Sequence, residues 1–262
     1  MSGSLNGRVA IVTGAGQGVG EGIARRLAQE GARVVVAARR AETGEPVAAS
    51  IRDVGGDAVC IETDVADGYS VRRCVDDTVK QFGRLDIVVH NAFTGGIPHR
   101  LEKAQIDKHW TAMSRTSVWA SLFCARESYH YLVESSQRPM GEGGGRLILI
   151  TSPSGVEGSA NIPLYSPAKA GQRAIAKSLA REWGPDGITV NCIAPVAASP
   201  SLLTAFERNP ALQQALEART PLGRVGDITQ DIGSVALFLA GDDSSYVTGQ
   251  TIVCDGGSFL GL

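Results

Sequence analysis

The sequence lacks an excess of charge of either sign. Its 262 residues carry 25 Lys and Arg against 27 Asp and Glu, which gives a formal net charge of −2. Proteins that bind nucleic acid or anionic membranes concentrate basic residues, so this composition gives no electrostatic reason to expect either partner. The sequence also has no apolar run that approaches the roughly 20 residues of a membrane span. We therefore expect neither nucleic-acid binding nor membrane insertion.

Cysteine and histidine are sparse and scattered. The five cysteines form no Cys-x-x-Cys pair, and four of them lie within or beside apolar runs. Buried free thiols in a reducing compartment fit this distribution better than disulfides do. The four histidines show no metal-ligand spacing, so no metal site is expected. The first residues, MSGSLNGRVAIVTG, lack the apolar stretch of a signal peptide, and we expect a cytoplasmic protein.

What the chain does have is a regular alternation of strand-like apolar runs and helix-like stretches. The runs lie at residues 8–13, 33–38, 57–62, 85–90, 146–151, 188–193 and 251–254. Near-continuous apolar strands joined by helices indicate a parallel sheet that is covered on both faces. No linker divides the pattern, and hydrophobic residues make up 43% of the chain. The sequence predicts an α/β fold over 1–262, with a doubly wound parallel sheet of about seven strands in a single domain.

A glycine-rich loop follows the first of these runs. It reads TGAGQGVG from Thr13 to Gly20, and a helical pattern that ends near Gly31 comes after it. Glycines admit a pyrophosphate close to the backbone, and a helix N-terminus supplies N–H groups and a positive dipole. The spacing is not Gly-x-Gly-x-x-Gly but Thr-Gly-x-x-x-Gly-x-Gly. A phosphate site is the favoured interpretation, and a tight turn without a ligand is the alternative.

Ser152, Tyr165 and Lys169 form the most informative constellation. Residues four apart on a helix share a face, so we expect the Lys169 ammonium to lie beneath the Tyr165 phenol. A cation there lowers the pKa of the tyrosine, which suits proton exchange with an alcohol or carbonyl near neutral pH. Ser152 ends the run RLILITS, from which its hydroxyl could bond the same reacting oxygen. Taken alone, Tyr-x-x-x-Lys fits a buried tyrosine beside a solvated lysine as well.

Together these motifs resemble the short-chain dehydrogenase/reductase family, over nearly the whole chain. The further segments that carry the resemblance are Asp64-Val65, His90-Asn91-Ala92-Phe93, NCIAPV and Asp255-Gly256-Gly257. The resemblance implies a Rossmann-type oxidoreductase that transfers a hydride between a nicotinamide and a carbonyl or secondary alcohol. It implies that Tyr165 is the general acid in reduction and the base in oxidation. Lys169 would hold the nicotinamide ribose, and Ser152 would steady the alkoxide.

The resemblance also assigns residues to the cofactor. It implies that Asp64 bonds the adenine, that Val65 offers backbone groups and that Asn91 lines the ribose. Pro195 and the residues up to Ala198 would flank the nicotinamide carboxamide. The full set expected at the cofactor is Gly14, Gln17, Gly18, Val19, Gly20, Arg39, Asp64, Val65, Asn91, Tyr165, Lys169, Pro195 and Ala198.

The end of the second strand-like run bears on the choice of cofactor. It reads VAARR from Val36 to Arg40 and offers no acidic residue to bind a ribose 2′-hydroxyl. The arginine that follows Ala38 suits a 2′-phosphate through its charge and fork geometry. We therefore expect Arg39 to bind NADP(H), with NAD(H) the less favoured cofactor. The alternative is that Arg39 and Arg40 only keep a surface loop hydrated.

The chain departs from the family pattern at several positions near the expected nicotinamide. Phe93 stands where the family has a glycine that passes close to the cofactor, and Val196 replaces the glycine of a Pro-Gly pair. Ser117 stands at the position of an asparagine that, in the family, holds a water linked to the lysine. A serine hydroxyl both donates and accepts, so we expect Ser117 to serve the same relay through water. We therefore count Ser117 with the catalytic residues.

Residues 195–220 interrupt the alternation just after a strand-like run. The resemblance implies a mobile helical lid over a small-molecule substrate here, and an ordinary surface helix pair is the alternative. It also implies a homotetramer or homodimer. A nucleotide-binding regulatory protein without turnover is the rival function. The departures at Phe93, Ser117 and Val196 favour the rival, and the intact Ser/Tyr/Lys set opposes it.

Overall fold

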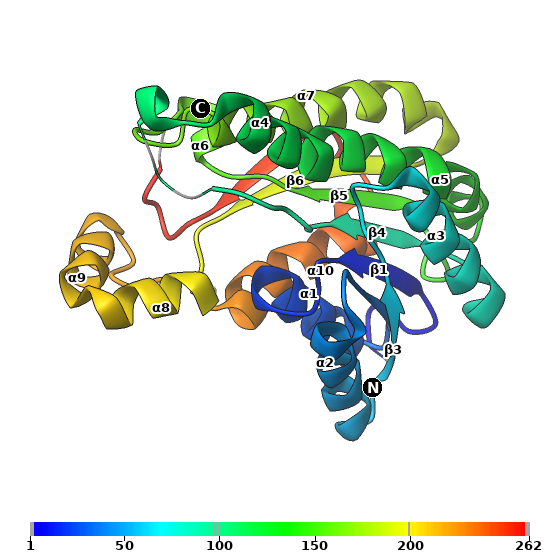
Figure 1. The fold of residues 1–262 in the computed structure, drawn as a ribbon. Helices are drawn as coiled ribbons and strands as arrows, with labels where there is room; N and C mark the ends of the chain where they lie inside the picture. The colour runs from blue at the N-terminus through cyan, green and yellow to red at the C-terminus, as the bar shows by residue number, and fades with distance from the viewer. Residues whose placement is uncertain (1–2, 97, 99, 199, 260–262) are drawn as a thin grey trace.

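The computed structural model describes residues 3–96, 98, 100–198 and 200–259. Seven strands form one parallel sheet in the order β3-β2-β1-β4-β5-β6-β7 (Figure 1). Each strand overlaps one of the predicted runs, which confirms the predicted doubly wound sheet. The strands are β1 (Val9–Thr13), β2 (Arg33–Ala38), β3 (Asp57–Glu62), β4 (Ile87–His90), β5 (Arg146–Ile150), β6 (Thr189–Pro195) and β7 (Thr251–Cys254).

Helices cover both faces of the sheet, because its strands are apolar on both sides. Successive side chains of β1 point to opposite faces, so Ala10 and Val12 belong to one core cluster while Val9 and Ile11 belong to the other. Figure 1 shows one helical layer on each side of the strands. The first layer contains α1 (Gly18–Gln29), α2 (Ala41–Asp53) and α10 (Ser234–Ala240), and the second contains α3 (Gly68–Phe82), α5 (Ala120–Ser136) and α7 (Tyr165–Trp183).

The helix α5 of the second layer is part of an unbroken helical run that changes its winding. Helix α4 (Ile106–Ser114) passes into a π-helical turn, η2 (Arg115–Trp119), which continues into α5, and the residues at both junctions keep helical backbone angles. Such π turns occur mostly within longer helices and frequently at functional sites. Here the turn carries Ser117.

Shorter elements complete the described chain. They are η1 (Leu101–Lys103), α6 (Ser154–Glu157), η3 (Gly184–Asp186), α8 (Pro200–Arg208), α9 (Pro210–Arg219), η4 (Ile228–Gly233) and η5 (Asp242–Ser244). Helices α8 and α9 make up the predicted lid and project from the body of the molecule (Figure 1). Residue 199, within the predicted lid 195–220, lies outside the described residues. Across the described part of the chain, no helix is long and apolar enough to cross a membrane.

The strand order determines where a ligand can bind. Strand β1 pairs with β2 on one side and with β4 on the other, so the winding of the chain reverses between β1 and β4. In open α/β sheets, ligands bind at the carboxyl ends of the strands beside such a reversal. The loops after β1 and β4 are the glycine-rich loop and the segment that begins at Asn91.

Candidate active site

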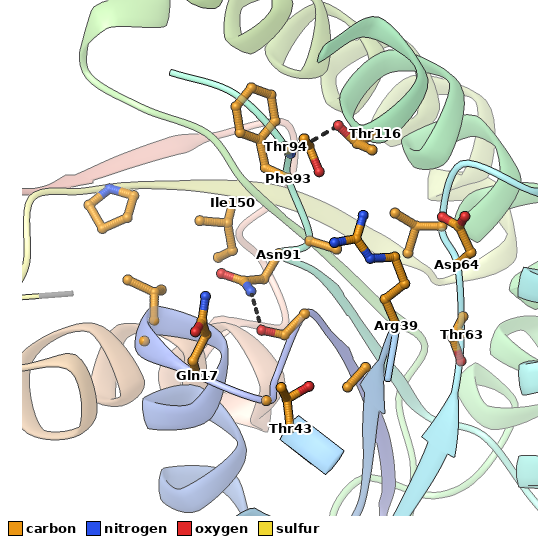
Figure 2. Close-up of a pocket in the computed structure, with 18 of the residues that line it drawn as sticks. Gln17, Arg39, Thr43, Thr63, Asp64, Asn91, Phe93, Thr94, Thr116 and Ile150 are labelled. Carbon is orange, nitrogen blue, oxygen red and sulfur yellow. Dashed lines mark hydrogen bonds between the residues drawn. The ribbon is translucent and has the colours of Figure 1, made fainter. Parts of the chain in front are cut away.

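A cleft of about 500 Å³ lies at the carboxyl ends of the strands. It brings together most of the residues that the sequence assigns to a cofactor, although they come from six separate segments (Figure 2). Those that line it are Gly14, Gln17, Gly18, Val19, Arg39, Asp64, Val65, Asn91, Tyr165, Lys169 and Pro195.

Close packing explains the glycines of the first loop. Gly14 has a φ of +66°, and a side chain there would place its Cβ 2.7 Å from the Cα of Ala92. A Cβ on Gly16 would lie 3.0 Å from the carbonyl oxygen of Thr43. Gln17, at the N-cap of α1, makes no side-chain capping bond to the first N–H groups of that helix. The loop therefore offers a side-chain-free cradle at a helix N-terminus, which is a suitable site for a phosphate.

Gly20 and Ala198 lie beside the cleft rather than on its lining. A Cβ on Gly20 would come 2.4 Å from Nδ2 of Asn91, so this glycine allows the first turn of α1 to pack against the β4 end. The N–H of Ala198 donates to the carbonyl oxygen of Gly226 at 2.9 Å, and the preceding residue, Ala197, lines the cleft instead.

Asn91 joins the ends of β1 and β4. Its Nδ2 donates to the carbonyl oxygen of Thr13 at 3.0 Å and to that of Gly14 at 3.2 Å, and Figure 2 shows the second of these bonds. The Thr13 hydroxyl accepts two backbone N–H groups, from Asn91 and Ala92, and so its single proton points to Nδ1 of His90 at 3.1 Å. Burial and the nearby Lys169 charge lower the pKa of His90 to about 3, so that its ring is neutral.

The β2 end of the cleft contains the two arginines that follow that strand. Arg39 and Arg40 are exposed, and Figure 2 shows the Arg39 side chain extending from the strand end into the cleft. Among the described residues, neither guanidinium has a hydrogen bond or ion pair. Asp64 accepts a hydrogen bond from the N–H of Ala66 at 3.0 Å, which leaves its second carboxylate oxygen available. This part of the cleft is therefore positively charged, and no described residue engages its arginines.

The other end of the cleft is built on the first turn of α7, which begins at Tyr165. Lys169 lies one turn further and is almost fully buried, with 3% of its surface exposed. Its ammonium donates to the carbonyl oxygen of Ile150 at 2.8 Å and to Oε1 of Gln172 at 3.1 Å. Burial lowers the pKa of Lys169 to about 7.

The pKa of Tyr165 moves opposite to the direction expected from the sequence. Burial raises it, and only the hydrogen bond with the Ser152 hydroxyl acts to lower it. The reason lies in the direction of the lysine, since the Lys169 ammonium is bonded to Ile150 and Gln172 and lies 5.9 Å from the centre of the Tyr165 ring. The phenol is therefore in its protonated form at neutral pH.

Phe93 covers the tyrosine and the lysine. Its ring meets the Tyr165 ring edge-on, with 5.2 Å between the ring centres. The ammonium of Lys169 lies 4.4 Å from the centre of the Phe93 ring, which is the geometry of a cation–π contact. The residue that departs from the family glycine therefore packs directly on the candidate catalytic pair.

The two serines assigned to catalysis occupy different environments. The Ser152 hydroxyl is partly buried near Tyr165 and shares a hydrogen bond of 2.8 Å with the Ser154 hydroxyl. Ser117 is fully buried in η2, and its hydroxyl donates to the carbonyl oxygen of Met113 at 2.6 Å. The Ser117 hydroxyl thus bonds within its own helical run, rather than toward Lys169 as expected.

Sequence reasoning did not assign several residues that line the cleft. Thr63, Ile150 and Thr151 lie at or directly after strand ends, so inspection of every strand end would have found them. No local sequence signal marks Thr94 and Thr116, which meet only through a long-range hydrogen bond from the Thr94 N–H to the Thr116 hydroxyl (Figure 2). The other lining residues that the sequence left without a role are Gly16, Ala38, Arg40, Thr43 and Ala92.

Comparisons with known proteins show which family the chain is similar to. The family described as enoyl-(acyl carrier protein) reductase matches residues 14–258. Tropinone reductase-like 3 of Erythroxylum coca is 33% identical, over 97% of this chain and 94% of that protein. Versicolorin reductase stcU of Emericella nidulans is 34% identical, over 97% of both chains. Short-chain dehydrogenase/reductase SDRA of Arabidopsis thaliana is 33% identical, over 97% of this chain and 95% of that protein.

The fold is likewise similar to a solved structure. A protein of Sinorhizobium meliloti 1021, which its name proposes to be a short-chain alcohol dehydrogenase, superposes with a TM-score of 0.88. It is 30% identical, and the match covers 97% of each chain.

Proposed function

The chain belongs to the short-chain dehydrogenase/reductase family, and on that premise we propose that it is an NADP(H)-dependent oxidoreductase of carbonyl or secondary alcohol substrates. One observation carries the proposal. A single cleft is lined both by the glycine-rich loop and by Tyr165 and Lys169, so a phosphate site and a proton-transfer site belong to one cavity. Neither feature is needed for a stable core, and their meeting supports hydride transfer from a bound nucleotide.

The residues of the cleft fit a dinucleotide. Gly14 and Gly16 line the cleft beside the N-terminus of α1 and present no side chain to a phosphate bound there. Arg39, which lies next to the small Ala38 and has no partner in the described part of the chain, supports a preference for the 2′-phosphate of NADP(H). Asp64 and Asn91 would hold the adenosine and ribose portions. When bound, this cofactor supplies the hydride chemistry, and the protein supplies orientation and protons.

Tyr165 is proposed to give a proton to the carbonyl oxygen during reduction and to take it back during oxidation. Burial keeps its phenol protonated near neutral pH, which favours the role of acid. Ser152, whose hydroxyl bonds Tyr165, would donate to the same substrate oxygen as negative charge develops there. Lys169 lies below this pair. Its pKa of about 7 leaves both the charged ammonium and the neutral amine populated at neutral pH.

The relatives guide the choice of substrates for a test. Those named for versicolorin and tropinone support fused aromatic ketones and bicyclic ketones as the first classes to assay. Phe93, which lines the cleft beside Tyr165, supports a planar substrate against its ring. A homotetramer or homodimer and a cytoplasmic location remain predictions, which sedimentation and fractionation would test.

The experiment measures NADPH oxidation with these ketones for the wild type, Tyr165→Phe and Tyr69→Phe. Tyr165→Phe keeps the ring and removes the proton, so we expect kcat to fall about 100-fold or more, because acid–base catalysis contributes roughly 10²–10⁴. NADPH affinity should change little. Tyr69→Phe makes the same change at an exposed residue outside the cleft and should leave kcat unchanged.

Two results would contradict the proposal. Turnover of Tyr165→Phe within a few-fold of the wild type would remove the tyrosine from the chemistry. A wild-type protein that binds NADPH tightly but reduces none of the ketones would favour the rival, a nucleotide-binding regulatory protein.

A further inference from the structure

A buried chain of polar groups connects Lys169 to the neighbouring helix α5. The Lys169 ammonium donates to Oε1 of Gln172 at 3.1 Å, and Nε2 of Gln172 donates to the hydroxyl of Ser121, also at 3.1 Å. Gln172 is 1% exposed and Ser121 is fully buried. Neither side chain lines the cleft, so this chain of groups lies behind the lysine.

The amide orientation of Gln172 follows from its two partners. An ammonium can only donate hydrogen bonds, so the atom that faces Lys169 must be the amide oxygen. The NH₂ group then faces Ser121, whose hydroxyl oxygen accepts. Burial of an amide is costly unless its groups are hydrogen-bonded, and an apolar side chain at this position would avoid that cost. The buried amide therefore indicates that its two hydrogen bonds, to Lys169 and to Ser121, have a function.

We propose that Gln172 is a positioning residue that holds the Lys169 ammonium beneath the cleft and anchors it to α5 through Ser121. The inference rests on the proposed function, in which Lys169 supports proton transfer by Tyr165. Ser117, for which the sequence predicted a water relay linked to the lysine, has its hydroxyl bonded to Met113 instead.

Gln172 matters because few other groups stabilise the charged lysine. The titratable groups that face Lys169 are Tyr165 on its own helix, Cys192 on β6 and His90 on β4. Burial raises the pKa of the Tyr165 phenol and brings the pKa of the Cys192 thiol to about 12, while the pKa of His90 is about 3, so all three are neutral near pH 7. No carboxylate forms an ion pair with Lys169 within the described chain. The acceptors that favour the ammonium are thus the Ile150 carbonyl and the Gln172 amide.

The sign of the effect follows from these contacts. Lys169 is charged below its pKa of about 7 and neutral above it. Loss of the Gln172 amide oxygen disfavours the ammonium and lowers the titration midpoint, whereas a carboxylate at the same position favours the ammonium and raises it. We expect Gln172→Leu to lower the midpoint of Lys169 by about one pH unit and Gln172→Glu to raise it by about one unit or more.

The midpoint can be measured directly, without substrate or turnover. The chain has five lysines, so ¹³C-lysine labelling gives few side-chain NMR signals, and Lys169→Arg identifies the one that belongs to Lys169. The full-length protein is titrated as wild type, Gln172→Leu and Gln172→Glu. With a working ketone, the pH at which reduction fails on the alkaline side should move in the same direction, and kcat should change more than KM.

A serine pair supplies a milder test with a matched control. Ser121→Ala removes the far anchor and leaves Lys169 and Gln172 in place, so we expect a smaller downward shift of the Lys169 midpoint. Ser128→Ala makes the same change on the same helix, at a fully buried serine whose hydroxyl bonds only carbonyls of its own helix, and should cause no shift. If Gln172→Leu fails to fold, this pair of variants decides.

The outcomes separate this inference from the proposed function. Midpoints that stay within about 0.2 pH unit of the wild type in Gln172→Leu, Gln172→Glu and Ser121→Ala would overturn the positioning role, even if the enzyme turns over. Shifted midpoints in a protein that reduces no ketone would support the anchor and count against the proposed reaction alone.

Discussion

The two ends of the cleft differ in how far their polar groups are already occupied. The phosphate end, made by residues 14–19 and Arg39, presents a bare glycine cradle and a guanidinium without a partner among the described residues. At the lysine end, formed by Phe93, Tyr165 and Lys169, the ammonium donates to two acceptors and the Phe93 ring covers a further side. The phosphate end is thus ready for an anion, while the lysine end is bonded to the protein itself.

The two ends of the cleft should therefore contribute to nucleotide binding in different ways. A site whose donors are already free and held in place gains the full interaction with its ligand. A site whose donors are occupied must first release some contacts, and that release weakens the observed affinity. We therefore expect nucleotide affinity to depend mainly on the phosphate end, and the lysine end to limit it.

The largest effect on use of the nucleotide should come from removing the charge of Arg39 at the phosphate end. Arg39→Ala should lower kcat/KM for NADPH by about 10- to 100-fold, because hydrogen bonds to charged groups contribute about 1.5–3 kcal/mol. The value for NADH should change little, since NADH has no 2′-phosphate. Arg72→Ala, on an exposed face of α3 outside the cleft, serves as the control. An enzyme that already prefers NADH, or an equal loss with both cofactors, would show that Arg39 does not select the 2′-phosphate.

A smaller change of opposite sign should follow from opening the lysine end. Phe93→Ala removes the ring that covers Lys169 and should tighten NADPH binding about three- to tenfold, because a cation–π contact contributes about 0.5–2 kcal/mol and would no longer compete. Fluorescence titration with NADPH and with 2′-phosphorylated adenosine nucleotides distinguishes the contributions of the two ends to affinity. Only the ligand that carries a nicotinamide ribose should gain affinity. Weaker binding of both ligands would mean that Phe93 supports the nucleotide rather than restricts it.

Sequence and structure agree best where a motif describes backbone geometry. Gly14 and Gly16 are required by close approaches of main-chain atoms, and the apolar runs determine both faces of the sheet, so the fold and the phosphate end could be predicted. The sequence predicts less well how Tyr165 and Lys169, one turn apart on α7, contact each other. The spacing of Tyr165 and Lys169 places them on one face, yet it does not determine the direction of the ammonium.

That direction depends on partners far away in the sequence. Ile150 lies 19 residues before Lys169, and the anchor of Gln172 lies on another helix, 51 residues away. The π turn that buries Ser117 depends equally on the packing of a long helical run, and no short motif in the sequence encodes it. Long-range hydrogen bonds of this kind are the part of the site that residue spacing could not predict.

The smallest effect should be found at Ser117, where the structure departs most from the expected relay. Ser117 and Ser128 are both fully buried, and each donates to the carbonyl four residues earlier, at 2.6 and 2.7 Å. Ser117→Ala and Ser128→Ala should therefore lose a similar free energy of unfolding, about 1 kcal/mol. Both should keep kcat within about twofold of the wild type, since neither hydroxyl is bonded to Lys169. Denaturant unfolding and ketone reduction by the two variants make the measurement. A tenfold loss of kcat in Ser117→Ala alone, with stability equal to that of Ser128→Ala, would restore the serine to the proton relay and show that the lysine end is less closed than its contacts indicate.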